Sequence, residues 1–229
     1  MKKGKLIVLD GTDGSGKATQ AKLLQARLKK EGYKVRALDF PQYEKNFFGK
    51  LIGECLAGTY GDFIAVDPHI ASVLYAADRF ESKAMLEKWL QAGYIVVLDR
   101  YVSANQIHQG GKIVDAKKRK QFLKWLDTLE FEVYGIPRPD LVCYLDVPRN
   151  ISDRLLTQGK QGLSTNKAAR GKQDLAEKNK AHLDASREGA LKLIKQGNVW
   201  ERIACAPKGE LFSREVIAEL VWDKVQGIL

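Results

Sequence analysis

Apolar residues along the chain follow two patterns, and their alternation predicts the order of strands and helices. Continuous apolar runs are typical of buried strands. Such runs occur at residues 6–9 and 94–98 and within the strand predicted at 139–146, and further strands are predicted at 35–40 and 199–203. Between them, apolar residues recur at helical spacing. These segments occupy residues 17–31, 47–56, 67–91, 103–108, 115–132, 150–156, 174–194 and 213–225. The alternation favours an α/β fold with a mostly parallel sheet that is covered by helices on both faces.

A glycine-rich turn joins the first predicted strand to the first predicted helix. Its sequence, Gly-Thr-Asp-Gly-Ser-Gly-Lys at residues 11–17, has the glycine and lysine spacing of a phosphate-binding loop. Glycines let the backbone curl until several N–H groups point into one hollow, and the helix N-terminus adds partial positive charge. Lys17 would reach the outer phosphates of a nucleotide. The order of strand, loop and helix therefore predicts a nucleotide-binding site.

The residue after the loop lysine departs from the usual motif. Most such loops have Ser or Thr there, whose hydroxyl binds Mg²⁺. This chain has Ala18, and its first hydroxyl belongs to Thr19. Two arrangements stay open: water and other carboxylates hold the metal, or Thr19 contributes.

Charged residues also end the strand predicted at 94–98. Asp99 and Arg100 follow it directly. Ligands of open α/β sheets bind at the carboxyl ends of the strands, so both residues are candidates for the site. An ordinary structural ion pair is the alternative for Arg100.

Length and composition fit one domain with an inserted flap. The chain has 229 residues, 45% of them hydrophobic, and a formal net charge of +10. We expect residues 1–229 to form a single domain, with a mobile lid at about residues 158–173, where glycine and lysine are frequent and apolar residues are few. Basic charge suits nucleic acid, an anionic membrane or small phosphorylated molecules, and the phosphate loop favours the last. The basic run at 117–120 is either a solvated helix face, which we favour, or a localisation or nucleic-acid patch.

Cysteine usage and the N-terminal region bear on the cellular compartment. Cys55, Cys143 and Cys205 are widely spaced, which suggests neither a disulfide framework nor a zinc site and fits a reducing cytosol. The apolar run near the start ends at Asp10 and is too short for a signal peptide or a membrane span. We therefore expect a cytoplasmic protein.

Three motifs in combination resemble those of the thymidylate kinases, in the nucleoside monophosphate kinase group. They are the loop at 11–17, Leu-Tyr-Ala-Ala-Asp-Arg-Phe-Glu at 74–81, and Asp-Arg-Tyr at 99–101 with Gln-Ile-His-Gln-Gly-Gly at 106–111. The resemblance implies a P-loop NTPase-type three-layer fold with a five-stranded parallel sheet and a mobile lid. It also implies transfer of the γ-phosphoryl group from ATP to the 5′-phosphate of dTMP, with Mg²⁺. A homodimer through long helices is expected, for which residues 67–91 could serve, and no nucleic-acid or membrane partner is expected.

The resemblance also implies roles for individual residues. ATP would be held by Gly11, Gly14, Ser15, Gly16, Lys17, Ala18 and Thr19, and hydrated Mg²⁺ by Asp99 and Thr19. The dTMP site would comprise Asp13, Phe40, Tyr43, Tyr75, Arg79, Arg100, Gln106 and His108. Among these, Tyr75 would stack on thymine, Arg79 would donate to a carbonyl of the base, and Arg100 would grip the acceptor phosphate. Without the resemblance, Tyr75 would be assigned to the core and Asp13 to the turn.

The catalytic set implied by the family is Lys17, Asp13, Arg100 and a cation from the lid. Family members take that cation from the loop or from the lid, and the loop position here is the uncharged Gly14. Arg170 is therefore the candidate, with Lys167 and Lys172 as helpers. Solvated loop residues are the alternative for all three.

Several positions depart from the family and bear on the acceptor. Tyr43 stands where an arginine is usual, Ala104 where a serine is common, and His108 where a tyrosine is common. Another nucleoside monophosphate or a deoxynucleoside therefore stays open as acceptor. A deoxynucleoside kinase would need a carboxylate just after the second strand, where the chain has Gln42 and Tyr43 before Glu44. A nucleic-acid-binding module is disfavoured because helix-turn-helix and zinc-finger signals are missing.

Overall fold

The structure is a computed structural model that describes residues 3–159, 180–196 and 199–229. A five-stranded sheet forms its centre, in the order β2-β3-β1-β4-β5, and every neighbouring pair is parallel. The strands are β1 (Lys5–Asp10), β2 (Val35–Asp39), β3 (Ile95–Asp99), β4 (Leu141–Asp146) and β5 (Trp200–Ala204). The predicted α/β fold with a five-stranded parallel sheet is confirmed.

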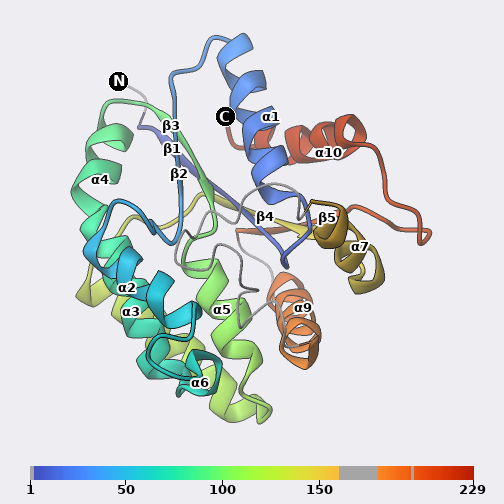
Figure 1. Cartoon of the computed structure of the whole chain (residues 1–229). Helices are drawn as coiled ribbons and strands as arrows, with labels where there is room; N and C mark the ends of the chain where they lie inside the picture. The colour runs from blue at the N-terminus through green and yellow to red at the C-terminus, as the bar shows by residue number, and fades with distance from the viewer. Residues whose placement is uncertain (1–2, 160–179, 197–198) are drawn as a thin grey trace.

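Helices follow the strands in the predicted alternation (Figure 1). The α-helices are α1 (Lys17–Lys30), α2 (Phe47–Leu56), α3 (Pro68–Glu81), α4 (Lys83–Gln91), α5 (Val102–Gly111), α6 (Ala116–Asp127), α7 (Arg149–Gly159), α9 (Lys180–Lys195) and α10 (Arg214–Gln226). A 3₁₀ turn, η1 (Phe63–Ala65), and a π-helical turn, η2 (Thr128–Val133), complete the described elements.

The period-two alternation of the strands divides the core into two layers. One face of β1, with Ile7 and Leu9, packs against apolar residues of α1, α7 and α10. The opposite face, with Leu6 and Val8, packs against α4, α5, α6 and α9. Helices α2 and α3 enclose a third apolar cluster. Both faces of the sheet are thus covered, as parallel sheets require.

Two helix predictions are wrong in detail. The helix predicted at 67–91 is broken at Ser82, which ends α3 and accepts a hydrogen bond from the Asn46 side chain. The helix predicted at 115–132 ends at Asp127 and continues as the π-helical turn η2. Of the predicted lid, Gln158 and Gly159 belong to α7, and the remainder lies outside the described residues.

The register of the strands aligns the charged ends that the sequence analysis singled out. Asp99 of β3 lies level with Leu9 of β1 and with Asp39 of β2. The phosphate-binding loop, Asp39 and Arg100 therefore meet at one edge of the sheet. All three cysteines are buried and free. In the part of the chain that the structure describes, no helix is sufficiently long and apolar to cross a membrane.

Candidate active site

A cavity of about 700 Å³ opens at the carboxyl ends of β1, β2 and β3. Most of the residues assigned from the sequence line it, namely Asp13, Gly14, Gly16, Lys17, Ala18, Thr19, Phe40, Tyr43, Tyr75, Arg79, Asp99, Arg100 and His108. Gly11, Ser15 and Gln106 do not line this cavity, and Arg170, Lys167 and Lys172 lie outside the described residues. Asp39, Asp78, Asn105 and Gln109 line it although the sequence analysis did not assign them.

The loop at residues 11–16 has the curled backbone that its glycines predict. Gly14 has φ 78°, in the left-handed region that favours glycine. The Gly11 N–H donates to Asp10 at the end of β1 (2.8 Å), and Asp10 in turn accepts from Ser103 of α5. The Ser15 hydroxyl is buried and has no hydrogen-bond partner among the described residues. The loop therefore combines a curled backbone with a buried hydroxyl that has no partner among the described residues.

Lys17 begins α1 and projects into the cavity. Its ammonium group donates to the Thr12 carbonyl at 3.0 Å and lies 3.7 Å from an Asp13 carboxylate oxygen. Burial and the nearby Arg100 guanidinium lower the pKa of Lys17, whereas Asp13 opposes this. The lysine is thus a buried cation beside the loop, which suits it to phosphate oxygens.

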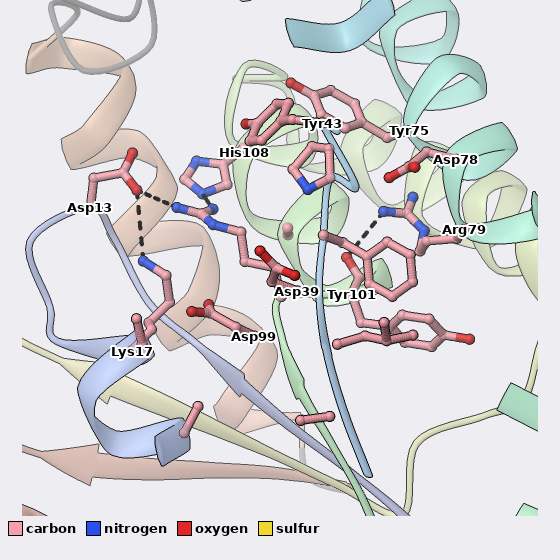
Figure 2. A pocket seen from close by; sticks show the side chains of 18 of the residues that line it. Asp13, Lys17, Asp39, Tyr43, Tyr75, Asp78, Arg79, Asp99, Tyr101 and His108 are labelled. Carbon is pink, nitrogen blue, oxygen red and sulfur yellow. Dashed lines mark hydrogen bonds and ion pairs between the residues drawn. The ribbon is translucent and has the colours of Figure 1, made fainter. Parts of the chain in front are cut away.

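Asp13, Arg100 and His108 all line the cavity and form a hydrogen-bonded chain, drawn as dashed lines in Figure 2. Burial would raise the pKa of Asp13, but the Arg100 and Lys17 cations outweigh it and hold the pKa well below its usual range. Arg100 has φ 67°, a conformation that is uncommon outside glycine and concentrates at functional sites. Its backbone N–H donates to the Leu9 carbonyl of β1. The fold therefore maintains an unusual backbone to aim this arginine at the loop.

The His108 ring has a defined tautomer in this arrangement. Arg100 Nη1 lies 2.7 Å from Nε2 of the ring, and a guanidinium can only donate. Nε2 must then accept, so Nδ1 carries the proton and donates to Ser186 Oγ of α9, at 3.1 Å. His108 thus links the arginine to α9.

Asp99 and Thr19 are the candidate metal-binding residues near the loop. Burial raises the pKa of Asp99, with Lys17 and Arg100 opposing, and the neighbouring carboxylates of Asp10 and Asp39 add to the rise. The described residues hold no cluster of three or more His, Cys, Asp or Glu side chains that could bind a metal alone. A single carboxylate with phosphate and water oxygens is the donor set that Mg²⁺ accepts, so the residues present fit this ion.

The other end of the cavity is aromatic and uncharged except for Asp78 and Arg79. Figure 2 shows Tyr75, Asp78 and Arg79 on one side of the view, Asp13 and Lys17 on the other, and His108 between them. Tyr75 and Arg79 come from successive turns of α3, as predicted. The Arg79 side chain is only 2% exposed and is paired with the buried Glu130 of η2. The sequence analysis missed Glu130.

Asp78 fixes the loop that carries Tyr43. Its carboxylate accepts from the Gln42 backbone N–H at 3.1 Å and from Asn46 Nδ2 at 3.0 Å. Burial raises the pKa of Asp78 to about 6, although these hydrogen bonds act against the rise. The loop after β2 is therefore anchored to α3.

Gln109 lines the cavity and has a buried acceptor atom. The residue is 5% exposed, and its Oε1 atom has no hydrogen-bond partner among the described residues. Buried polar atoms without a partner are uncommon and are often completed by a ligand or water. No signal beyond its position in the 106–111 motif distinguishes Gln109 in the sequence.

Gly14 also contacts α7. A Cβ atom there would lie 2.5 Å from the Ser152 carbonyl and 2.8 Å from Leu156 Cγ. A charged side chain at this position would displace α7, so the loop has no room for the cation that some family members place there.

Comparisons with known proteins agree with this arrangement. A sequence model described as thymidylate kinase matches residues 9–215. The thymidylate kinase of Mycobacterium tuberculosis is 29% identical over 147 residues, which cover 64% of this chain and 68% of that protein. A probable thymidylate kinase of Pyrobaculum aerophilum is 34% identical over 154 residues, which cover 66% and 69%. A solved structure of thymidylate kinase from Candida albicans shares the fold, with a TM-score of 0.73 at 21% identity over 98% of this chain and 92% of that one.

Proposed function

The chain belongs to the thymidylate kinase family, and from this premise we infer that it transfers the γ-phosphoryl group of ATP to the 5′-phosphate of dTMP, giving dTDP and ADP. The observation that carries this function is a cavity with two unlike ends. A phosphate-binding loop with Lys17 occupies one end, and Tyr75 with Arg79 occupies the other. Arg100 joins Asp13 of the loop to His108, which lies between the two ends in Figure 2. Two nucleotides can therefore bind with their phosphates meeting at Arg100.

At the donor end, the loop amides and Lys17 would hold the ATP phosphates. The amides of residues 17–19 belong to the first turn of α1, where the helix dipole favours negative charge. Lys17 would exchange its present contacts with Thr12 and Asp13 for phosphate oxygens. Phosphoryl transfer needs little covalent help from the protein, so positioning and charge stabilisation account for most of the catalysis.

Mg²⁺ would bind beside Asp99, with Thr19 and water completing its shell together with phosphate oxygens. When bound, the ion would neutralise charge on the transferring phosphoryl group. Asp99 lies at the end of β3, so a rigid strand sets its position.

At the acceptor end, Arg100 and Tyr43 would hold the 5′-phosphate and Tyr75 would stack on the base. The planar guanidinium of Arg100 suits a phosphate. Asp13 and His108 hold that guanidinium before any ligand arrives, and this lowers the entropy that binding would otherwise cost. Gln109 Oε1 would accept from a ring N–H of the base. Asn105 is a second candidate for the base because it lines the same cavity, whereas Gln106 does not.

The transition-state cation would come from the lid, because α7 closes off the space at Gly14. Arg170 remains the sequence-based candidate. The assignment rests on the loop and not on any contact of Arg170, which lies outside the described residues.

A homodimer is proposed for the assembly. Helix α3 exposes Ile70, Val73 and Phe80 at 61%, 37% and 48%, and Phe47 of the adjoining α2 is 70% exposed. Apolar side chains grouped on one surface are typical of protein interfaces. Light scattering coupled to size-exclusion chromatography should show twice the chain mass, and Ile70→Asp should shift the mass toward the monomer. A monomeric wild-type protein would contradict the proposal.

An acceptor panel tests the function. ADP release should be measured with ATP, Mg²⁺ and each of dTMP, dUMP, dCMP, dAMP, dGMP, thymidine and single-stranded DNA. Thymidine is included because Asp39, at the end of β2, lines the cavity and could act as a base toward a hydroxyl acceptor. We expect the highest kcat/KM with dTMP. A preference for thymidine, or stimulation by DNA alone, would overturn the proposal.

A further inference from the structure

Arg79 and Glu130 form an ion pair that is removed from solvent. The side chains are 2% and 0% exposed. Arg79 Nε donates to Glu130 Oε2 at 3.1 Å, and Nη2 makes a second, shorter contact with Oε1. Buried ion pairs often add no more stability than apolar side chains of similar size would. The pair therefore calls for an explanation other than stability.

A local irregularity of the backbone delivers Glu130 to this position. Phe122, Leu126 and Glu130 recur at a spacing of four, so the glutamate continues the buried face of α6. The α-helix ends at Asp127, and the π-helical turn η2 follows, with a bond from the Tyr134 N–H to the Leu129 carbonyl. π-Helical turns are rare and frequent at functional sites. The turn is a second observation, independent of the pair itself, that marks Glu130.

The ion pair with Glu130 leaves Arg79 with a defined set of unused N–H donors. A guanidinium has five N–H groups and no acceptor. Contacts with Glu130 use one N–H on Nε and one on Nη2, and Nη1 donates to the Tyr101 carbonyl at 3.2 Å (Figure 2). Each terminal nitrogen keeps one N–H beyond these contacts, and Arg79 lines the cavity at the Tyr75 end. A base that contacts these two remaining N–H groups must present an acceptor atom to them.

We propose that Glu130 is a specificity-determining positioning residue, which holds Arg79 so that its remaining N–H groups select a pyrimidine with a carbonyl at position 4 over one with an amino group. This inference rests on the proposed function and names the residue that sets its base preference. If an amino group of the base faces the fixed N–H donors of Arg79, the donors of both molecules are left buried without acceptors. A site of this kind rejects such a base strongly. An arginine released from Glu130 can turn away from the base, so an amino group would be tolerated better.

The test compares dTMP with 5-methyl-dCMP, which has an amino group in place of the carbonyl at position 4 and an N3 atom without a proton. The difference at N3 is the same for every protein variant, so a change in the ratio between variants reports on position 4. kcat and KM should be measured for the wild type, Glu130→Gln and Glu130→Asp. Glutamine removes the charge, and aspartate keeps the charge but is too short to hold both nitrogens. Glu132→Gln is the matched control, because Glu132 lies in the same turn and is exposed.

We expect the preference for dTMP to shrink about tenfold or more in both Glu130 variants, mainly through a higher KM for dTMP. The KM for ATP and the Glu132→Gln preference should stay at wild-type values. A purely structural role would lower kcat/KM for both acceptors by the same factor. An unchanged ratio would therefore overturn the proposal even if both rates fell.

Urea denaturation and the wild-type kinetics together separate an effect on folding from an effect on function. Urea denaturation shows whether each variant folds, and loss of folding in both Glu130 variants would assign the pair to folding and overturn the proposal. A wild-type enzyme that phosphorylates neither acceptor would overturn the proposed function, and this inference with it. A wild-type preference for dTMP that persists in folded Glu130 variants would overturn this inference alone.

Discussion

The buried carboxylate of Asp78 should make the stability of the protein fall as pH rises, and Asp78→Asn should remove that fall. Burial raises the pKa of Asp78 from 3.8 to about 6. Between these values the folded state binds a proton that the unfolded state has already released. The stability that Asp78 contributes is therefore fully present below pH 3.8 and is lost as the pH rises through about 6.

The size of the effect follows from the pKa change. A rise from 3.8 to about 6 corresponds to about 3 kcal/mol between the two ends of the range. Asparagine keeps an oxygen for the Gln42 N–H but cannot accept from Asn46 through its amide nitrogen. That loss lowers stability by about 1 kcal/mol at every pH and does not alter the slope.

Urea denaturation of both proteins from about pH 4 to about pH 8 measures the effect. The unfolding free energy of the Asn variant minus that of the wild type should increase by about 2.5 kcal/mol across this range, because part of the full change occurs below pH 4. Glu132→Gln, which removes an exposed carboxylate, should show a nearly constant difference. A constant difference for Asp78→Asn would refute the reasoning, because it would mean that this carboxyl group titrates normally in the folded protein.

Three further substitutions test the site. Gly14→Ala should lower the unfolding free energy by about 1–3 kcal/mol more than Gly32→Ala in denaturant titrations, because both have positive φ but only Gly14 meets α7; equal losses would contradict the proposed contact. Arg100→Lys should lower kcat/KM for dTMP by about tenfold to a hundredfold in steady-state assays, because lysine cannot bridge Asp13 and His108 as a planar fork; wild-type kinetics would remove Arg100 from the acceptor site. Arg170→Ala should lower kcat far more than ATP affinity, as expected of a contact made in the transition state; near-normal turnover in the same assay would remove this assignment.

Local sequence signals predicted the order of strand, glycine-rich loop and helix at residues 11–17, and the structure contains β1, the curled loop and α1 in that order. Within this segment, the Lys17 ammonium group lies 3.7 Å from the Asp13 carboxylate. The fold class followed from the alternation of strands and helices, and the parallel order of five strands confirms it. The location of Asp99 and Arg100 at the carboxyl end of β3 was also predictable, because both follow the apolar run at 94–98 directly.

Long-range pairing was not predictable from the sequence. Glu130 and Arg79 are 51 residues apart, and their pairing depends on how η2 turns relative to α3. The glutamate at a buried position of the α6 pattern was a usable signal, but helical periodicity alone does not show a π-helical turn. Asp78 escaped notice for the same reason, because its partners Gln42 and Asn46 lie in a different segment. The break at Ser82 depends on tertiary packing, which overrides the helical pattern of residues 67–91.

The central claim is that Lys17 and the loop hold ATP and aim it at a second nucleotide held by Arg100. Transfer of labelled phosphate from [γ-³²P]ATP to dTMP measures this directly, in the wild type and in Lys17→Ala at saturating substrates. We predict labelled dTDP in the wild type and a rate lower by about 10²-fold or more in Lys17→Ala, as expected when a cation at developing charge is removed. The account would be contradicted by undiminished transfer in Lys17→Ala, or by a wild-type protein that forms no labelled dTDP.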